Sequence, residues 1–424
     1  MHTIAPPSAP AGLLLTGGGA RAAYQVGVLE AIADLRKLAG AQDQPNPLKI
    51  ITGTSAGAIN AAALACGADD FDKAVRQIVD VWKNFSADQV YQADSLSVLR
   101  TGAKWMTLMS LGWILAKWRR VKPKSLLDNS PLEELLKRLV PLERLPELIR
   151  AGHVQALAVT GSSYSSGDHI TFFEGDKRLM PWVRSQRRSV RDRITHEHLL
   201  ASSAIPFVFP AKALQIEGRT EYFGDGSMRQ SAPVAAAIHL GAEKVLVIGA
   251  GRMAEPRMAA LSESTVRYPS VAQIAGHAMS SIFLDSLAVD VERVRRINQT
   301  MKLVPPEARA ASCLRPVELL LISPSERLDS VAARHIGDLP RAVRALLGGV
   351  GVSSAKADVK GSALASYLLF ESKFTTELMA MGYADAQLQK SEICQFFGWE
   401  LPVEHRVEPI RPEWMNRRKD PLRL

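Results

Sequence analysis

The chain has 424 residues, of which 47% are hydrophobic and 22% charged, and its formal net charge at pH 7 is +9. This balance is that of an ordinary globular protein, and it excludes wholesale disorder, a collagen-like repeat and a polytopic membrane protein. The length suits one large domain with an extension. Three scattered cysteines (Cys66, Cys313 and Cys394) are too few for a disulfide framework or a four-ligand zinc site, and they suit a reducing compartment.

The N-terminal sequence has no charged leader before a long apolar core, so we expect no secretory signal. No stretch reaches the roughly 18–20 consecutive apolar residues that are needed to span a bilayer. From these two observations we expect a cytoplasmic protein.

Two strand–helix units are predicted in the first 66 residues. An apolar run over 13–16 stops at three glycines, which indicates a buried strand, and a helix with apolar residues on one face follows. A second buried strand is predicted over 49–52 and a helix of small residues over 55–65. This order predicts parallel strands with a right-handed crossover.

The rest of the chain continues as a mixture of both element types. Residues 70–150 have a mainly helical pattern, a helix is predicted to end near 204, and another is predicted over 233–240. Beyond residue 329 an Ala- and Leu-rich helical pattern dominates and ends in a polar, basic tail. Strands are predicted over 154–160, 170–174, 213–217, 220–223, 244–248 and 316–322.

The pentapeptide Gly53-Thr54-Ser55-Ala56-Gly57 fits the pattern G-x-S-x-G between a predicted strand and a predicted helix. In that context the serine sits on a tight turn in a sparsely populated backbone conformation, and the glycines avoid clashes across the turn. The turn lifts the Ser55 hydroxyl clear of the sheet at the start of a helix, where negative charge is favoured. The alternative is an ordinary helix start with Ser55 as the N-cap.

A glycine-rich loop, Gly17-Gly18-Gly19-Ala20-Arg21, follows the first predicted strand. Because the loops after two parallel strands emerge at the same sheet edge, its backbone N–H groups can lie beside Ser55 and stabilise an oxyanion. Arg21 can hold the shape of the loop or pair with an acid. Gly17, Gly19 and Ala22 also fit a dinucleotide fingerprint, but no carboxylate ends the second strand as that motif requires.

A nucleophilic serine needs a base, and none of the nine histidines stands in a recognisable signature. An ordinary α/β-hydrolase fold fits poorly, because several strands should precede its serine. Asp225, in Tyr222-Phe223-Gly224-Asp225-Gly226-Ser227, is the remaining candidate. On local sequence alone, Asp-Gly is first of all a turn signal.

Basic residues are concentrated in three runs, Arg100–Lys124, Lys177–Arg193 and Arg406–Leu424. Each run fits an anionic partner or a solvated surface. In the first, three tryptophans alternate with cations around an apolar stretch, a pattern suited to a membrane interface, although a cap helix with aromatic core residues fits equally. No nucleic-acid module accompanies the runs, so no nucleic acid is expected. The candidates for membrane-surface contact are Trp105, Trp113, Lys117, Trp118, Arg119 and Arg120.

Together these motifs resemble the patatin-like phospholipases. The resemblance rests on the glycine loop, the Ser55 pentapeptide, Ala201-Ser202-Ser203-Ala204-Ile205-Pro206, and Asp225-Gly226-Ser227, in the family's order over roughly residues 11–250. Two small departures are Ala22, where the family commonly has glycine, and Ser227, where it commonly has Gly or Ala.

The resemblance implies a three-layer α/β/α fold with a mainly parallel central sheet. It implies a catalytic domain over 1–325 with a helical, cap-like insertion over about 70–150. Residues 326–424, whose pattern is helical, do not match the family's core and are expected to form a C-terminal extension with a basic tail. The resemblance also implies a Ser55–Asp225 dyad, with Gly17 to Arg21 as the oxyanion hole and Gly53 and Gly57 shaping the turn.

The activity that follows is serine-dependent hydrolysis of fatty acyl esters of phospholipids or lysophospholipids, without a metal or organic cofactor. The protein would then contact anionic membranes peripherally, on their inner face. Two alternatives are an acyltransferase that uses the same dyad and a membrane-associated scaffold without enzymatic activity.

Overall fold

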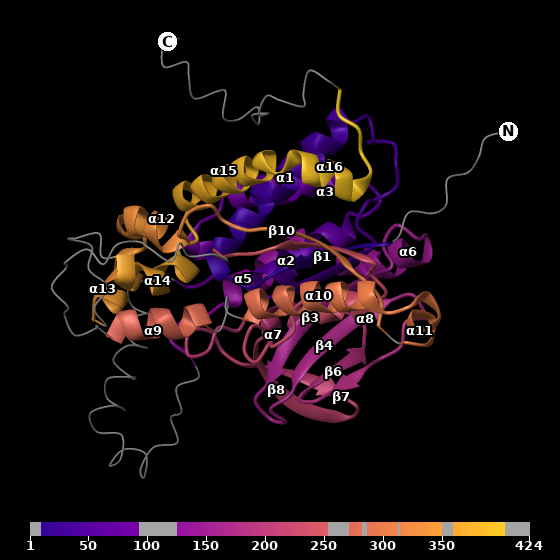
Figure 1. The fold of residues 1–424 in the computed structure, drawn as a ribbon. Coiled ribbons are helices and arrows are strands. Elements are labelled where there is room, and N and C mark those ends of the chain that lie inside the picture. The colour runs from indigo at the N-terminus through magenta and orange to yellow at the C-terminus, as the bar shows by residue number, and fades with distance from the viewer. Residues whose placement is uncertain are drawn as a thin grey trace.

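The fold is taken from a computed structural model that describes residues 10–92, 125–252, 271–281, 286–312, 314–349 and 359–402. Within these residues a ten-stranded sheet lies between helices on both of its faces (Figure 1). The fold is therefore the expected α/β/α arrangement, with a mixed and mostly parallel sheet. All six candidates for membrane contact between Trp105 and Arg120, and the basic tail from Arg406, lie outside the described residues.

The sheet has the strand order β10-β9-β1-β2-β3-β4-β6-β5, and β8 pairs with β3 while β7 pairs with β8. Strands β10, β9, β1, β2 and β3 are parallel neighbours, whereas β4 and β8 run antiparallel to β3. The strands are β1 (Ala11–Leu15), β2 (Ile50–Thr54), β3 (Ala156–Ser163), β4 (His169–Gly175), β5 (Val183–Arg184), β6 (Arg187–Arg191), β7 (Lys212–Ile216), β8 (Arg219–Asp225), β9 (Lys244–Ile248) and β10 (Glu318–Ile322).

A short 3-10 helix, η1 (Gly19–Ala22), precedes the first α-helix. The described α-helices are α1 (Ala23–Leu38), α2 (Ala56–Cys66), α3 (Phe71–Lys83), α5 (Ser130–Leu139), α6 (Leu145–Arg150), α7 (His196–Ser202), α8 (Ala235–His239), α9 (Val271–Ser280), α10 (Ser286–Leu303), α11 (Pro306–Ala311), α12 (Leu328–His335), α13 (Arg341–Gly349), α14 (Val359–Leu368), α15 (Ser372–Leu388) and α16 (Lys390–Phe397).

Strand β1 explains why apolar runs without alternation form the centre of this sheet. Successive side chains of a strand point to opposite faces. Leu13 and Leu15 join the larger core under α1, α2 and α15, while Leu14 joins a second core with Leu287 and Val291 of α10. Both faces are buried, so both sets of positions must be apolar.

The C-terminal helices share the larger core with the first helix. Helix α15 lies along α1 (Figure 1). A Cβ atom at Gly27 of α1 would lie 1.9 Å from the Met379 carbonyl oxygen, and one at Gly382 of α15 would lie 2.1 Å from that of Tyr24. Glycine at both positions lets the two helix backbones touch. The C-terminal segment that was expected as an extension therefore packs on α1 and buries its apolar face.

One strand pair was not predicted from the sequence. The basic run Lys177–Arg193 contains β5 and β6, which form the edge of the sheet beyond β4. The Arg191 guanidinium lies 5.0 Å from the centre of the Phe173 ring, and Arg188 pairs with Asp168 and Glu221 at 3.4 Å. The charges hid the strand pattern, and several of these cations bind residues of the protein itself. Charged edge strands also resist pairing with other chains.

Among the described residues, no helix is both long and apolar enough to cross a membrane.

Candidate active site

Ser55 lies on the turn between β2 and α2, as expected. Its backbone angles are φ 55° and ψ −132°, in a region that residues other than glycine rarely adopt. The side chain is 1% exposed. The turn leads directly into α2, and Ser55 immediately precedes the first helical residue. At this position the dipole of the helix favours negative charge.

Gly53 and Gly57, on either side of Ser55, occupy positions where a side chain would clash with the backbone. A Cβ at Gly53 would lie 2.5 Å from the Gly57 carbonyl oxygen, and one at Gly57 would lie 2.5 Å from the carbonyl oxygens of Leu15 and Thr16. Gly57 thus lets the start of α2 touch the end of β1, from which the glycine loop emerges. The pentapeptide therefore joins the two loops as well as bending the chain.

The Ser55 hydroxyl donates a hydrogen bond of 2.6 Å to Oδ2 of Asp225. Asp225 is the last residue of β8, which pairs antiparallel with β3 through Gly161, and β3 is the neighbour of β2. The sheet therefore brings together two side chains that are 170 positions apart. The other carboxylate oxygen, Oδ1, accepts a 2.9 Å hydrogen bond from the Ser227 backbone N–H.

Burial raises the pKa of the Asp225 carboxyl to about 6, because the side chain has no contact with water. The hydrogen bonds from Ser55 and Ser227 stabilise the ionised form and limit this rise. A carboxylate with such a pKa is a better base than an ordinary aspartate and is still ionised at neutral pH.

The segment Ala201–Pro206 holds the serine and the aspartate in register. The Ser202 hydroxyl accepts a 2.9 Å hydrogen bond from the Ser55 backbone N–H, while the Ser202 carbonyl accepts one of 3.0 Å from Gly226. The Ala204 carbonyl accepts a 2.9 Å bond from the Asp225 backbone N–H. Sequence reasoning noted this segment without giving Ser202 a role, since no local pattern indicates a contact with residue 55.

The glycine loop lies beside Ser55, because Gly19 and Ser55 line the same cavity. Gly19 has φ 55°, and the turn closes through a 3.1 Å hydrogen bond from the Arg21 backbone N–H to the Gly18 carbonyl. The Arg21 guanidinium pairs with Asp329 of α12, so it binds an acid of the C-terminal region. The loop thus presents its glycine backbone, and not a cation, toward the cavity that holds the serine.

In the described part of the chain, no histidine hydrogen-bonds to Ser55 or Asp225. His169 contacts the residue that follows Asp225: its Nε2 lies 3.0 Å from the Gly226 carbonyl oxygen. Burial lowers the pKa of His169 to about 4, so the ring is neutral at physiological pH. The described part of the chain also contains no group of three His, Cys, Asp or Glu side chains placed to hold a metal ion.

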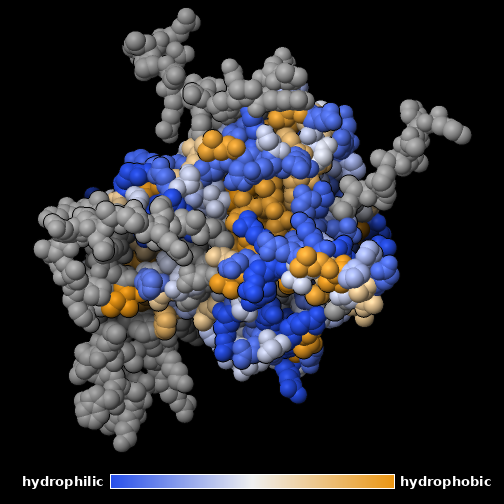
Figure 2. All heavy atoms as spheres, in the orientation of Figure 1, coloured by the Kyte–Doolittle hydropathy of each residue, from blue (hydrophilic) through white to orange (hydrophobic). Residues whose placement is uncertain are grey.

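A cavity of about 480 Å³ opens at Ser55 and runs along α2 between α3 and α5. This volume is ordinary for a site that binds a small molecule. Figure 2 shows an apolar area ringed by hydrophilic side chains on the face seen in Figure 1. The apolar side chains that line the cavity are Ala56, Ile59, Ala63, Ala74, Ile78, Val81, Trp82, Phe85, Val90, Leu132, Leu135, Leu136, Leu139, Val140, Pro141, Ile205, Phe209 and Phe370.

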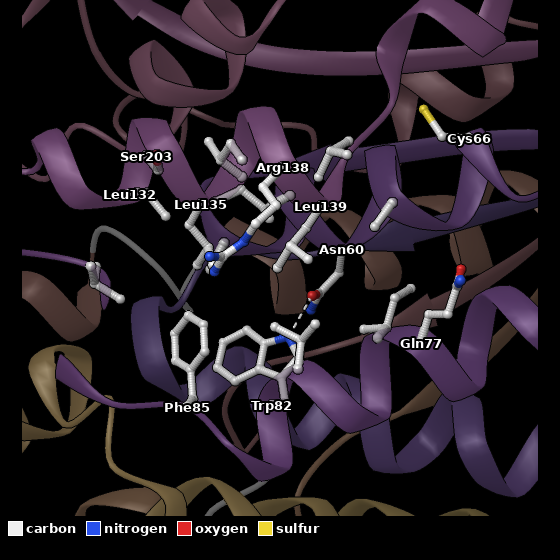
Figure 3. Close-up of a pocket in the computed structure, with 18 of the residues that line it drawn as sticks. Asn60, Cys66, Gln77, Trp82, Phe85, Leu132, Leu135, Arg138, Leu139 and Ser203 are labelled. Atoms are coloured by element: carbon white, nitrogen blue, oxygen red, sulfur yellow. Dashed lines mark hydrogen bonds between the residues drawn. The ribbon is translucent and has the colours of Figure 1, made fainter. Parts of the chain in front are cut away.

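The polar residues that line the cavity are Ser55, Asn60, Gln77, Asp80, Arg138, Arg144 and Ser203. Asn60 of α2 accepts a 2.9 Å hydrogen bond from the Trp82 indole N–H, which leaves the Trp82 ring facing the cavity (Figure 3). Arg138 of α5 points into the cavity from the opposite side, above Phe85 (Figure 3). The cavity therefore combines an apolar trough along α2 with two arginines in its lining, Arg138 and Arg144, and the Ser55 hydroxyl at its end.

Comparison with known proteins gives a family and matches to solved structures. The family model for patatin-like phospholipases matches residues 13–238, about half of the chain. Among solved structures, VipD from Legionella pneumophila is 14% identical, with 88% of this chain and 67% of that chain covered and a TM-score of 0.30. The type III effector ExoU is 16% identical, with 96% and 91% covered and a TM-score of 0.26. No curated protein sequence matches.

Proposed function

Because this chain belongs to the patatin-like phospholipase family, whose members are typically lipid acyl hydrolases, we propose that it cleaves fatty acyl esters of phospholipids with Ser55 as nucleophile and Asp225 as base. The observation that carries this proposal is the 2.6 Å hydrogen bond between the Ser55 hydroxyl and Asp225 at the end of an apolar cavity. A nucleophile with its base in hydrogen-bonding distance is the first requirement of acyl transfer.

The reaction would proceed in two steps. Ser55 Oγ attacks the ester carbonyl carbon while Oδ2 of Asp225 accepts the hydroxyl proton, and the alcohol leaves with that proton. Water then attacks the acyl-enzyme and gives its proton to Asp225, which passes that proton to Ser55 Oγ as the bond to the acyl carbon breaks and the fatty acid is released. The negative charge on the carbonyl oxygen would be stabilised by the backbone N–H groups of Gly18 and Gly19, and one such donor typically lowers a barrier by about 3–4 kcal/mol.

The cavity supports a long acyl chain as the group transferred. The face of α2 that lines it runs from Ala56 to Cys66, and at 1.5 Å per residue this is a trough of about 15 Å. Burying methylene groups there contributes roughly 0.8 kcal/mol each. A lipid with a long chain therefore gains binding energy that a short ester cannot.

Arg138 favours a phospholipid over a neutral lipid. Its guanidinium is exposed and lines this cavity, and no ion pair of Arg138 is found within the described part of the chain, whereas Arg144, the other arginine of the lining, pairs with Asp69. A guanidinium binds phosphate oxygens through two parallel hydrogen bonds. Arg138→Gln should therefore slow hydrolysis of a phospholipid more than that of a triacylglycerol with the same acyl chains.

The test compares Ser55→Ala and Asp225→Ala with the wild type on a short-chain p-nitrophenyl ester and on a phospholipid. Both variants should lose more than about 1000-fold in kcat on both substrates, since nucleophile and base act as a unit. Circular dichroism of each variant checks that the fold is intact. A folded Ser55→Ala variant with full hydrolysis would exclude the proposed nucleophile.

A further inference from the structure

The Arg21 side chain ties the glycine loop to two C-terminal helices. It is 2% exposed, and its guanidinium pairs with Asp329 of α12. Its Nε donates a 2.7 Å hydrogen bond to the Ser366 hydroxyl of α14, and its guanidinium carbon lies 4.0 Å from the centre of the Tyr367 ring. An arginine held by an acid, a hydroxyl and an aromatic face has little freedom to move.

The loop backbone also rests directly on α14. A Cβ atom at Gly19 would lie 2.3 Å from the Tyr367 carbonyl oxygen, so the glycine backbone and that carbonyl are in van der Waals contact. The Arg21 backbone N–H bonds to the Gly18 carbonyl across the turn. A displacement of Arg21 would therefore move Gly18 and Gly19, whose N–H groups face the reacting carbonyl in the proposed mechanism.

We infer that Arg21 is a positioning residue, and that Asp329, Ser366 and Tyr367 form with it a clamp that fixes the oxyanion loop from the C-terminal region. This inference rests on the proposed function, because it concerns the loop of that same site. The clamp partners lie outside residues 13–238, so the part of the chain matched by the family model obtains its loop geometry from a segment beyond it.

The chain offers a matched control for the clamp. Arg36, on the last turn of α1, is 3% exposed, pairs with Asp72 at 3.0 Å, and lies 5.6 Å from the centre of the Phe71 ring. It resembles Arg21 in burial, charge partner and aromatic neighbour, but neither Arg36 nor Asp72 lines the cavity. Removing either acid leaves a buried arginine without its partner, so both changes should lower the melting temperature.

The experiment compares Asp329→Asn with Asp72→Asn in the full chain, below the melting temperature of each. It measures kcat and KM on a p-nitrophenyl ester and the rate at which a fluorophosphonate modifies Ser55. A misplaced loop should cost the Asp329→Asn variant about 10- to 100-fold in kcat, with KM within about twofold of wild type. Modification should slow in proportion, because the attack also places charge on an oxygen in the loop. The Asp72→Asn variant should keep its kcat within about twofold.

Equal kcat for the two variants would overturn the inference, as would a loss in both that follows their melting temperatures. If Asp329→Asn does not fold, Ser366→Ala removes one hydrogen bond of the clamp and should lower kcat about 3- to 10-fold, and an unchanged kcat would be contrary evidence. A wild type without hydrolysis or labelling would count against the proposed function, whereas an active wild type with an indifferent clamp would count against this inference alone.

Discussion

The backbone of Ser55 has a strained conformation, and this conformation sets the position of its side chain. Its positive φ is costly for a residue with a Cβ, by about 1–3 kcal/mol, and only the close contacts of Gly53 and Gly57 make the turn possible. Asp225 adds a second cost, since a carboxylate without water favours its protonated form. Both unfavourable contributions to the free energy of folding arise at one site, as is common at functional sites.

The pKa of Asp225 predicts how activity depends on pH. If the ionised carboxylate is the base, kcat/KM on a p-nitrophenyl ester should rise with pH, about tenfold per unit below pH 6, and level off above it. His169 does not confound this range, because its pKa of about 4 keeps it neutral. Measurements of kcat/KM at intervals from pH 5 to 8 give the profile, and a flat profile would be incompatible with Asp225 as base.

Replacement of Asp225 by asparagine should stabilise the protein. The pKa of the carboxyl is about 6 when folded and 3.8 in its ordinary state, so the unfolded chain releases this proton first as pH rises. The stability contributed by the protonated carboxyl is therefore present below about pH 4 and is lost as pH rises through 6, by about 3 kcal/mol.

Asparagine carries no charge at any pH. Asp225→Asn should therefore unfold at higher urea concentration than the wild type at pH 8, with little difference at pH 4, while its hydrolysis is lost. An asparagine variant that is less stable than the wild type at pH 8 would show that the carboxylate is better accommodated than its burial implies.

Helix α2 links the serine to the cavity at the scale of secondary structure. Gly57 lets α2 approach β1, while Ala56, Ile59 and Ala63 line the cavity along another face of the helix. These positions are three or four residues apart, so they share one face of the helix. The element that orients the nucleophile also shapes the binding site.

Filling this trough should change the preference for chain length. The Ala63→Phe side chain would occupy space midway along α2, so kcat/KM for a p-nitrophenyl palmitate should fall about 10-fold or more relative to the wild type. The butyrate ester, which does not need the far end, should react nearly as before and serves as the internal control. An unchanged ratio of the two rates would place the acyl chain elsewhere.

The elements that the sequence predicted best are those whose signal is local. The Ser55 turn and the glycine loop each occupy a few residues with steric requirements of their own, and strands 244–248 and 316–322 are plain apolar runs. The cavity could not be predicted, because Ser55, Trp82, Leu135 and Phe370 meet only through tertiary packing. Strands β5 and β6 were missed because arginines occupy most of their positions.

The whole molecule depends on packing between its two ends. Helix α15 covers α1, and Tyr91 donates a 2.9 Å hydrogen bond to the Leu368 carbonyl. The Phe370 ring packs at a tilt against Trp82 and Phe85 in the cavity wall. The C-terminal helices thus contribute to the core, the cavity and the loop. The sequence pattern indicated helices there but could not indicate what they cover, since amphipathic helices can pack on any apolar face.

A chain that ends near residue 325 should therefore fail to fold as a stable unit. Its α1 would expose the apolar face that α15 now covers, so the truncated protein should be aggregated or should lack cooperative unfolding. Gly382→Ala tests the same contact in the full chain. Its Cβ would lie 2.1 Å from the Tyr24 carbonyl oxygen, and we expect a loss of about 1–3 kcal/mol.

Gly337→Ala is the control for that substitution, because no atom lies within 4 Å of its added Cβ and its effect on stability should be small. A truncated chain with cooperative unfolding and full hydrolysis would show that the C-terminal helices are a dispensable extension.

In the proposed reaction the buried Ser55 hydroxyl, hydrogen-bonded to Asp225, is the nucleophile. The most direct measurement treats the wild-type protein with a fluorophosphonate and maps the modified peptide by mass spectrometry. We predict one adduct on Ser55, its absence in Ser55→Ala, and much slower formation in Asp225→Asn. An adduct on another residue of the folded protein would mean that Ser55 is not the nucleophile, and equal rates with and without the Asp225 carboxylate would mean that Asp225 does not activate it.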